Sequence, residues 1–161
     1  MTGTLATTRA APPTIPSSAA LLGYFGVLPF AAGAAIMVLD GVGPISAATA
    51  QVALVAYGAV ILSFLGGIRW GAGLRIRDED MRGRVLALSV IPSLIAWVAL
   101  LMPALYALGL LVAAFVAQGA WDVRSTQDGH FPRWFGQLRI RLTLMVTLIL
   151  IVATFVLMFL R

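Results

Sequence analysis

Five apolar stretches, each about twenty residues long, take up most of this chain of 161 residues. Stretches of that length cross the ~30 Å hydrocarbon layer of a bilayer as helices. Lipid offers backbone N–H and C=O groups no partner, so only hydrogen bonds within each helix satisfy them. The sequence therefore predicts an all-α, polytopic bundle of five transmembrane helices, at about residues 20–39, 49–74, 85–102, 104–121 and 142–160.

The composition excludes an ordinary soluble domain. Hydrophobic residues make up 61% of the chain, charged residues only 11%, and the mean hydropathy is +1.00. Soluble domains carry about a quarter charged residues. The net charge of +5 is better explained by topology signals beside the spans than by nucleic-acid binding, and it suits contact with anionic membrane lipids. With no cysteine in the chain, disulfides and thiolate chemistry are excluded.

The distribution of arginine predicts the orientation of the bundle. All eleven positive residues are arginines: Arg69 lies inside a span, nine lie in alternate links or the N-terminal tail, and Arg161 alone lies on the other side. Under the positive-inside rule the N-terminus and both basic links face the cytoplasm, or the matrix of an organelle, and the C-terminus faces outward. Residues 1–19, rich in Thr, Ala, Ser and Pro, are expected to form a disordered cytoplasmic tail before a five-helix domain over residues 20–161.

Local residue chemistry predicts where the helices break and begin. Pro29 and Pro92 interrupt the first and third spans, because proline lacks an N–H and crowds the preceding turn. Residues 40–44, with the sequence DGVGP, are expected to form a tight turn. The acidic triplet at residues 78–80 is expected to cap the third helix, and only Pro103 separates the third span from the fourth, which predicts a tight helical hairpin.

Arg69 is the strongest candidate for a functional residue. An ionised side chain inside the hydrocarbon costs about 2.5–3.5 kcal/mol on insertion scales, so it needs compensation. The second and fourth spans both run toward the cytoplasm in the predicted topology, which brings Asp122 to the depth of Arg69 and predicts an intramembrane charge pair. The alternative is that Arg69 reaches the headgroups by itself, with Trp70 as an interfacial anchor.

Small residues predict how two of the helices pack. Around Arg69 lie Gly66, Gly67, Gly71 and Gly73, and Gly109 begins a stripe of small residues with Ala113 and Ala117 on the fourth span. Small residues let helix backbones approach closely. We therefore expect the second and fourth helices to be packing partners.

The tryptophans are the remaining candidates for contact with ligands. Trp70 and Trp134 lie near the cytoplasmic boundary, where an aromatic belt contacts lipid. Trp97, near the middle of the predicted third span, either packs in the core or lines a cavity for a quinone or lipid tail. We expect no catalytic residue, cofactor or metal site, because no nucleotide-binding or metal-binding motif occurs and His130 is the only histidine.

Three segments carry a resemblance to a known family: residues 57–71 (YGAVILSFLGGIRWG), 92–97 (PSLIAW) and 132–143 (PRWFGQLRIRLT). They resemble the motifs of a domain-of-unknown-function family of small bacterial inner-membrane proteins with mitochondrial transmembrane relatives. The resemblance covers about residues 20–160, and it departs from the family at Phe135, where a tyrosine is expected. It implies five helices in a bacterial inner membrane, or in the mitochondrial inner membrane if the source is eukaryotic, but no activity.

Two functions remain after these exclusions. The first is a non-catalytic accessory or assembly subunit that docks against other subunits of a respiratory or photosynthetic membrane complex. The second is a small transporter or channel with an anion or lipid-headgroup site at Arg69 and helix breaks at Pro29 and Pro92. An enzyme is the least supported function, because the spans show no convincing nucleophile, base or metal ligand set.

Overall fold

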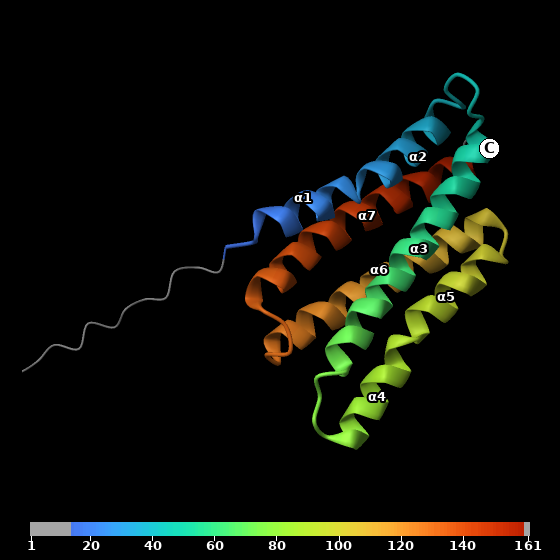
Figure 1. Ribbon diagram of the computed structural model, residues 1–161. Coiled ribbons are helices and arrows are strands. Elements are labelled where there is room, and N and C mark those ends of the chain that lie inside the picture. The colour runs from blue at the N-terminus through green and yellow to red at the C-terminus, as the bar shows by residue number, and fades with distance from the viewer. Residues whose placement is uncertain (1–13, 160–161) are drawn as a thin grey trace, which may run out of the picture.

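The computed structural model describes residues 14–159, and the spans within that range are helical (Figure 1). Two of the five passes are each divided into two helices. Most of the predicted tail, residues 1–13, lies outside the described range, while residues 17–19 belong to the first helix instead of the tail. The helices are α1 (Ser17–Phe25), α2 (Leu28–Val38), α3 (Ala47–Gly73), α4 (Glu79–Ser89), α5 (Ile91–Leu100), α6 (Ala104–Gln127) and α7 (Arg133–Phe159).

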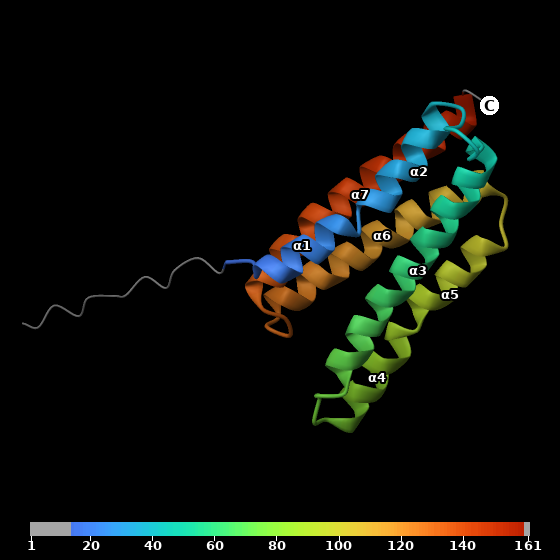
Figure 2. The same cartoon turned by 45° about the horizontal axis from the view of Figure 1, so that its top comes forward.

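Five segments are long and apolar enough to cross a membrane, which agrees with the predicted five-helix bundle. Passes that follow one another in the chain run antiparallel (Figure 1), with α6 packed along α7 and α3 packed along the α4–α5 pass. Helix α2 packs on both α3 and α7, whereas α1 contacts α7 but not α3. Toward the end that holds the α3–α4 and α6–α7 links, these two hairpins diverge (Figures 1 and 2).

The helices extend beyond several of the predicted spans. The third pass begins at Glu79 instead of residue 85, and the fifth begins at Arg133 instead of residue 142. Much of the segment expected to be a polar link after residue 121 is therefore helical, and only residues 128–132 connect α6 to α7. At 1.5 Å per residue the 27 residues of α7 are about 40 Å long, so its first turns can reach the headgroup layer.

Both proline breaks lie just before the proline. Helix α1 ends at Phe25 and α2 begins with Pro29 in its first turn. In the same way, α4 ends at Ser89 and α5 begins with Pro92 in its first turn. The first turn of a helix tolerates proline because its N–H groups have no partner within the helix.

Helix starts and the α2–α3 turn follow their local sequence. Oδ1 of Asp78 accepts a 2.7 Å hydrogen bond from the backbone N–H of Met81, which confirms the predicted acidic cap of the third pass. Gly41 and Gly43 both adopt a positive φ in the predicted turn, at 118° and 57°. Glycine takes such a φ without the steric cost of a Cβ.

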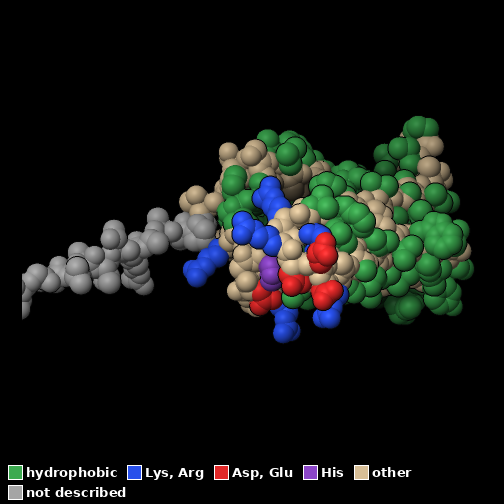
Figure 3. Space-filling view, turned by 60° about the horizontal axis from the view of Figure 1, so that its bottom comes forward, with side chains coloured by type: hydrophobic (Ala, Val, Ile, Leu, Met, Phe, Trp, Pro, Cys, Tyr) green, Lys and Arg blue, Asp and Glu red, His purple; other side chains and the backbone are tan. Residues whose placement is uncertain are grey.

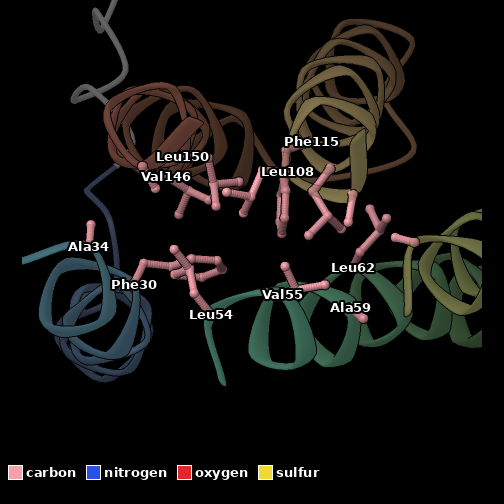
Figure 4. Packing of buried hydrophobic residues seen from close by; sticks show 14 of the residues in the cluster. Phe30, Ala34, Leu54, Val55, Ala59, Leu62, Leu108, Phe115, Val146 and Leu150 are labelled. Carbon is pink, nitrogen blue, oxygen red and sulfur yellow. The ribbon is translucent and has the colours of Figure 1, made fainter. Parts of the chain in front are cut away.

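The core lies where α2, α3, α6 and α7 face one another (Figure 4). Phe30 from α2 contacts Phe115 from α6, with ring centroids 5.8 Å apart and planes nearly perpendicular. Phe30 also contacts Tyr57 from α3 at 4.9 Å. The largest completely buried side chains are Phe30, Met37, Leu54, Leu62, Leu108, Leu111 and Leu150.

Two of the predicted packing glycines lie in tight helix contacts, but with the third pass instead of the fourth. A Cβ at Gly66 would lie 2.6 Å from the carbonyl oxygen of Ser89, at the α4–α5 break. A Cβ at Gly73 would meet the side chains of Val85 and Leu86 at 3.2 and 3.1 Å. Glycine at position 66 therefore lets the backbone of the broken pass approach α3.

The packing role predicted for the other glycines is corrected by the structure. A Cβ at Gly67, Gly71 or Gly109 would meet no atom within 4 Å. Ala113 and Ala117 are exposed together with Gly109, so the predicted stripe on the fourth pass faces away from the bundle. The spacing of the small residues correctly predicted that they share one face of α6. It did not show whether that face packs against the bundle or lies on the surface.

Exposed side chains divide the surface into an apolar body and a charged end. Figure 3 shows the charged side chains gathered together, with hydrophobic side chains covering much of the rest of that face. Trp97 is 59% exposed, which excludes the core position considered for it. Since α5 ends at Leu100, Trp97 lies within one turn of the opposite end of its pass, where, with the exposed Tyr106, it suits an interfacial belt.

We predict that Gly66→Ala destabilises the protein and that its neighbour Gly67→Ala does not. The new methyl group at position 66 must displace the Ser89 backbone, an overpacking that costs about 1–3 kcal/mol. At position 67 the methyl group meets open space, and alanine gains up to about 1 kcal/mol in helix propensity. Unfolding of both variants by dodecyl sulfate in mixed micelles, followed by circular dichroism, measures the difference. Equal midpoints would contradict the tight contact.

The predicted orientation is testable with single cysteines, because the chain has none of its own. We expect Val42→Cys, at an exposed position in the α2–α3 turn, to react with a membrane-impermeant maleimide in spheroplasts of a bacterial host. We expect Arg77→Cys, in the basic α3–α4 link, to react only after the membrane is opened. The reverse pattern would invert the topology.

Candidate functional site

Three charged side chains are buried among the residues that the structure describes. They are Arg69 on α3, Asp122 on α6 and Arg139 on α7, with exposed fractions of 4%, 2% and 7%. Arg69 lies four residues before the end of α3, and Asp122 lies five residues before the end of α6. At 1.5 Å per residue this places both about 6–8 Å from the charged end of their helices. We call these three residues the charge cluster.

Asp122 is the centre of the charge cluster. Nε of Arg139 donates a 2.7 Å hydrogen bond to its Oδ2, and Nη2 of Arg69 lies 2.9 Å from its Oδ1. Nε2 of Gln118, one turn earlier on α6, donates to Oδ1 at 3.2 Å. One carboxylate therefore joins α6 to both α3 and α7. The structure thus places the predicted partners Arg69 and Asp122 together and adds a second arginine.

Arg69 is enclosed by α6. Its Nη1 donates a 3.1 Å hydrogen bond to Oγ of Ser125, and its guanidinium carbon lies 3.6 Å from the ring centroid of Trp121. A guanidinium over an indole face is attracted by the ring quadrupole, and more strongly when water is excluded. Trp121 therefore covers the cation, so Arg69 does not extend alone to the headgroups.

Arg139 is the member of the charge cluster that sequence reasoning missed. We expected it in a hydrated basic link, as one of the arginines that set the topology. The structure places it in the second turn of α7, since that helix begins at Arg133. The available signal was the spacing of Gly136, Arg139 and Thr143 at i, i+3 and i+7, which puts all three on one helix face.

The residues around the charge cluster hold α6 and α7 close together. A Cβ at Gly119 would lie 2.5 Å from Oγ1 of Thr143, and a Cβ at Gly136 would lie 3.0 Å from the methyl group of Thr126. Oγ1 of Thr126 donates to the Asp122 carbonyl at 2.9 Å. Glycine on each helix thus accommodates threonine on the other. These glycines, and not the predicted Gly109, form the close contact of the fourth pass.

The charge cluster carries a surplus positive charge, because two arginines share one carboxylate. The chain has six acidic residues, and the other five are Asp40, Asp78, Glu79, Asp80 and Asp128. All five are exposed, Asp40 follows α2 at the opposite end, and Glu79 pairs with Arg82 at 3.0 Å. Residues 1–13 contain no Asp or Glu. No acidic side chain of this protein therefore balances the second arginine.

Part of each guanidinium has no acceptor in the described part of the chain. Nε of Arg69 and Nη2 of Arg139 are buried without a hydrogen-bond partner. Oγ1 of Thr143, one turn after Arg139, is also buried and unpartnered. A buried polar group without a partner costs about 1–3 kcal/mol, and more when it is charged. Of these three residues, Arg139 and Thr143 also line a cavity, whereas Arg69 lines neither of the two described below.

A cavity of about 490 Å³ adjoins the charge cluster. Its walls are mainly apolar side chains from α1, α2, α3, α6 and α7, and the polar groups on its wall include Arg139 and Thr143. Trp134 lies on its wall as well, whereas Arg69, Trp70 and Trp97 do not. A second cavity of about 560 Å³ lies between α6 and α7 and includes Arg124 and Asp128 but no member of the charge cluster.

The chemistry available to the charge cluster is electrostatic binding. Its one carboxylate is held by two arginines, and arginine stays protonated in proteins, so neither guanidinium serves as a general base. Residues 14–159 hold no group of three or more His, Cys, Asp or Glu side chains placed to bind a metal ion. The arrangement can fix helices and attract an anion.

Comparison with known proteins gives a family and two relatives. Residues 15–155 match a family described as a protein of unknown function, DUF3429. The chain is 34% identical over 144 residues to Transmembrane protein 69 of Xenopus tropicalis, a match that covers 84% of this chain and 53% of that protein. It is 33% identical over 144 residues to Transmembrane protein 69 of Mus musculus, covering 88% and 57%. The chain thus spans a little over half the length of these relatives. No solved structure matches it.

We predict that Asp122→Asn destabilises the protein more than loss of either arginine. Removing the carboxylate leaves two buried cations uncompensated, and breaking a buried pair in this way costs about 3–5 kcal/mol. Arg69→Gln or Arg139→Gln instead leaves one neutral pair in place. The exposed Asp128→Asn is the control and should unfold like the unsubstituted protein. Unfolding midpoints in mixed micelles give the order, and an Asp122→Asn midpoint equal to that of Asp128→Asn would remove the central role of Asp122.

Proposed function

The chain belongs to the DUF3429 family of proteins of unknown function, and we propose that it serves as a non-catalytic accessory or assembly subunit of a larger membrane complex. It is an integral, multi-pass membrane protein, as its five apolar helices and its relatives named Transmembrane protein 69 indicate. The proposed setting is an energy-transducing inner membrane that holds a respiratory or photosynthetic complex. The proposed partners are other membrane subunits and lipids.

The observation that carries this proposal is the engagement of Asp122 from two sides. Its two oxygens lie 2.7 Å from Arg139 and 2.9 Å from Arg69, so the carboxylate joins three helices into one unit. A group that carries protons or ions through a membrane must gain and lose its partners during each cycle. A buried carboxylate held by two guanidinium groups is suited to a fixed structural role.

A transporter with its anion site at Arg69 is less well supported. Arg69 is covered by Trp121 and contacts Ser125, and it lines neither of the two cavities. Transporters place broken helices around a substrate path at mid-membrane. Here the break before Pro92 is filled, because it packs directly against the backbone of Gly66. The break before Pro29 is linked to α3 by a 3.0 Å hydrogen bond from Oη of Tyr57 to the carbonyl of Gly26.

The outer faces offer surface for docking on several passes. Phe64 on α3, Trp97 on α5 and Phe155 on α7 are 62%, 59% and 56% exposed. In a membrane, such a face contacts either lipid or the helices of a partner protein. A partner replaces lipid on a face where its helices can pack closely. A subunit that docks should use one of these faces and leave the others in lipid.

Photo-crosslinking from these positions tests the proposal. We expect a photoreactive phenylalanine analogue at one of positions 64, 97 and 155 to crosslink to a discrete membrane protein in intact cells, and the others to lipid. Leu150 is fully buried, so the analogue there is the control for crosslinks within the chain. The tagged protein should also migrate with the crosslinked partner on native gels after extraction in a mild detergent.

Two results would contradict the proposal. One is recovery of a lone monomer or homo-oligomer in every mild detergent. The other is labelling of lipid alone from all three exposed positions.

A further inference from the structure

We propose that the cavity beside α7 binds one anionic phospholipid, with its phosphate on Arg139 and Thr143 and an acyl chain in the apolar part. The site uses the surplus charge of the cluster and does not rest on the docking of a partner subunit, although Phe64 lines this cavity and also belongs to one of the candidate docking faces. The bilayer is the source of the ligand, and the cavity is reached from the side.

The polar part of the cavity wall includes one guanidinium, that of Arg139, and one hydroxyl, that of Thr143. Arg139 is 7% exposed, and its Nε is bound to Asp122 while its Nη2 has no hydrogen-bond partner. Oγ1 of Thr143 is buried and unpartnered one helical turn later, on the same face of α7. Both residues line the cavity, and Thr143 lines the second cavity as well. Nη2 and Oγ1 are themselves covered by protein, so both side chains must turn toward the cavity to meet a ligand. A phosphate oxygen accepts hydrogen bonds from a guanidinium and a hydroxyl, so it satisfies both groups at once.

The charge of the ligand follows from the cluster. Arg69 and Arg139 share Asp122, and the other acidic residues are exposed elsewhere. A ligand with one negative charge would make the site neutral, whereas a zwitterionic or neutral headgroup would not. This argument favours an anionic phospholipid over phosphatidylcholine and over a quinone, which carries no charge.

The depth of the site matches a headgroup. Arg139 is the seventh residue of α7, so it lies about 9 Å from the start of a helix about 40 Å long. If α7 is centred in a hydrocarbon layer of ~30 Å, about 5 Å of it lies outside on each side, so the backbone of Arg139 lies about 4 Å inside the boundary. A long arginine side chain can reach a phosphate from that depth. Trp134 lines the cavity five residues nearer the helix start, at the level where indole rings contact headgroups.

The apolar part of the cavity fits an acyl chain and has an opening toward lipid. Its volume of about 490 Å³ is within the range of about 300–1,000 Å³ seen for small-molecule sites. Helix α1 packs on α7 but does not contact α3, so the cavity lies between α1 and α3. Leu22 and Phe64 line it from these two helices and are 72% and 62% exposed. A lipid chain can therefore enter sideways between them.

Four variants test the site. Arg139→Gln removes the charged donor but leaves Asp122 paired with Arg69, so the fold keeps a neutral pair. Thr143→Val removes only the hydroxyl. Ala19→Trp fills the apolar part from α1 and changes no charge. Arg141→Gln is the matched control, because Arg141 is exposed and lies two residues from Arg139.

The measurement is native mass spectrometry of the delipidated full chain in detergent, titrated with phosphatidylglycerol or with phosphatidylcholine of the same chains. We expect one phosphatidylglycerol per chain at a concentration about tenfold below that for phosphatidylcholine. Arg139→Gln and Ala19→Trp should each raise the apparent Kd for phosphatidylglycerol about tenfold, Thr143→Val less, and Arg141→Gln not at all.

Three outcomes would overturn the proposal. The first is equal binding of the two lipids. The second is unchanged affinity in both Arg139→Gln and Ala19→Trp. The third is displacement of phosphatidylglycerol by millimolar inorganic phosphate with no effect of Ala19→Trp, which would make this a free phosphate site. If Arg139→Gln does not fold, the other two variants decide, because neither touches the ion pairs.

Discussion

The sharing of Asp122 between two arginines is the interaction on which the charged end of this bundle depends. Hydrophobic burial does not drive helices together in lipid as it does in water, so packing and polar contacts decide which helices meet. The α3–α4 and α6–α7 hairpins diverge toward the charged end (Figures 1 and 2). Asp122 joins α3 to α6 across this divergence through Arg69, and it fixes α7 through Arg139. It thereby orients helices whose apolar faces alone would allow several arrangements.

The cavity results from the break before Pro29, which divides the first pass into α1 and α2. The break before Pro29 lets α1 pack on α7 while α2 packs on both α3 and α7. The space that remains between α1 and α3 is the cavity. Oη of Tyr57 donates to the carbonyl of Gly26, and this hydrogen bond ties α3 to the break. The break before Pro29 thus divides the first pass into α2, which packs in the core, and α1, which borders the cavity.

The features of this structure that depend on local chemistry were predicted correctly from the sequence. Hydropathy predicted five passes, and proline and aspartate chemistry predicted the breaks and the cap at Asp78. The rotation of each helix about its axis depends on packing across the bundle, which one sequence does not contain. Gly109 therefore faces outward, Gly119 forms the close contact, and Trp97 lies on the surface. Arg139 was missed because the first turns of α7 are polar, and a polar helical extension has the same composition as a polar link between spans.

One arginine would be enough to join the helices through Asp122, so the second arginine of the charge cluster points to a binding role. A pair of one arginine and one aspartate would join two helices and leave no charge, whereas a further arginine adds an insertion cost of about 2.5–3.5 kcal/mol. Arginine presents its donors in a rigid, planar fork, so one group can serve two partners on different sides. In Arg139 the Nε donor fixes α7 to α6, and the Nη2 donor on the same plane has no partner. The anionic surface of the bilayer supplies what that second donor lacks, so the membrane itself completes the charge balance that the chain leaves open.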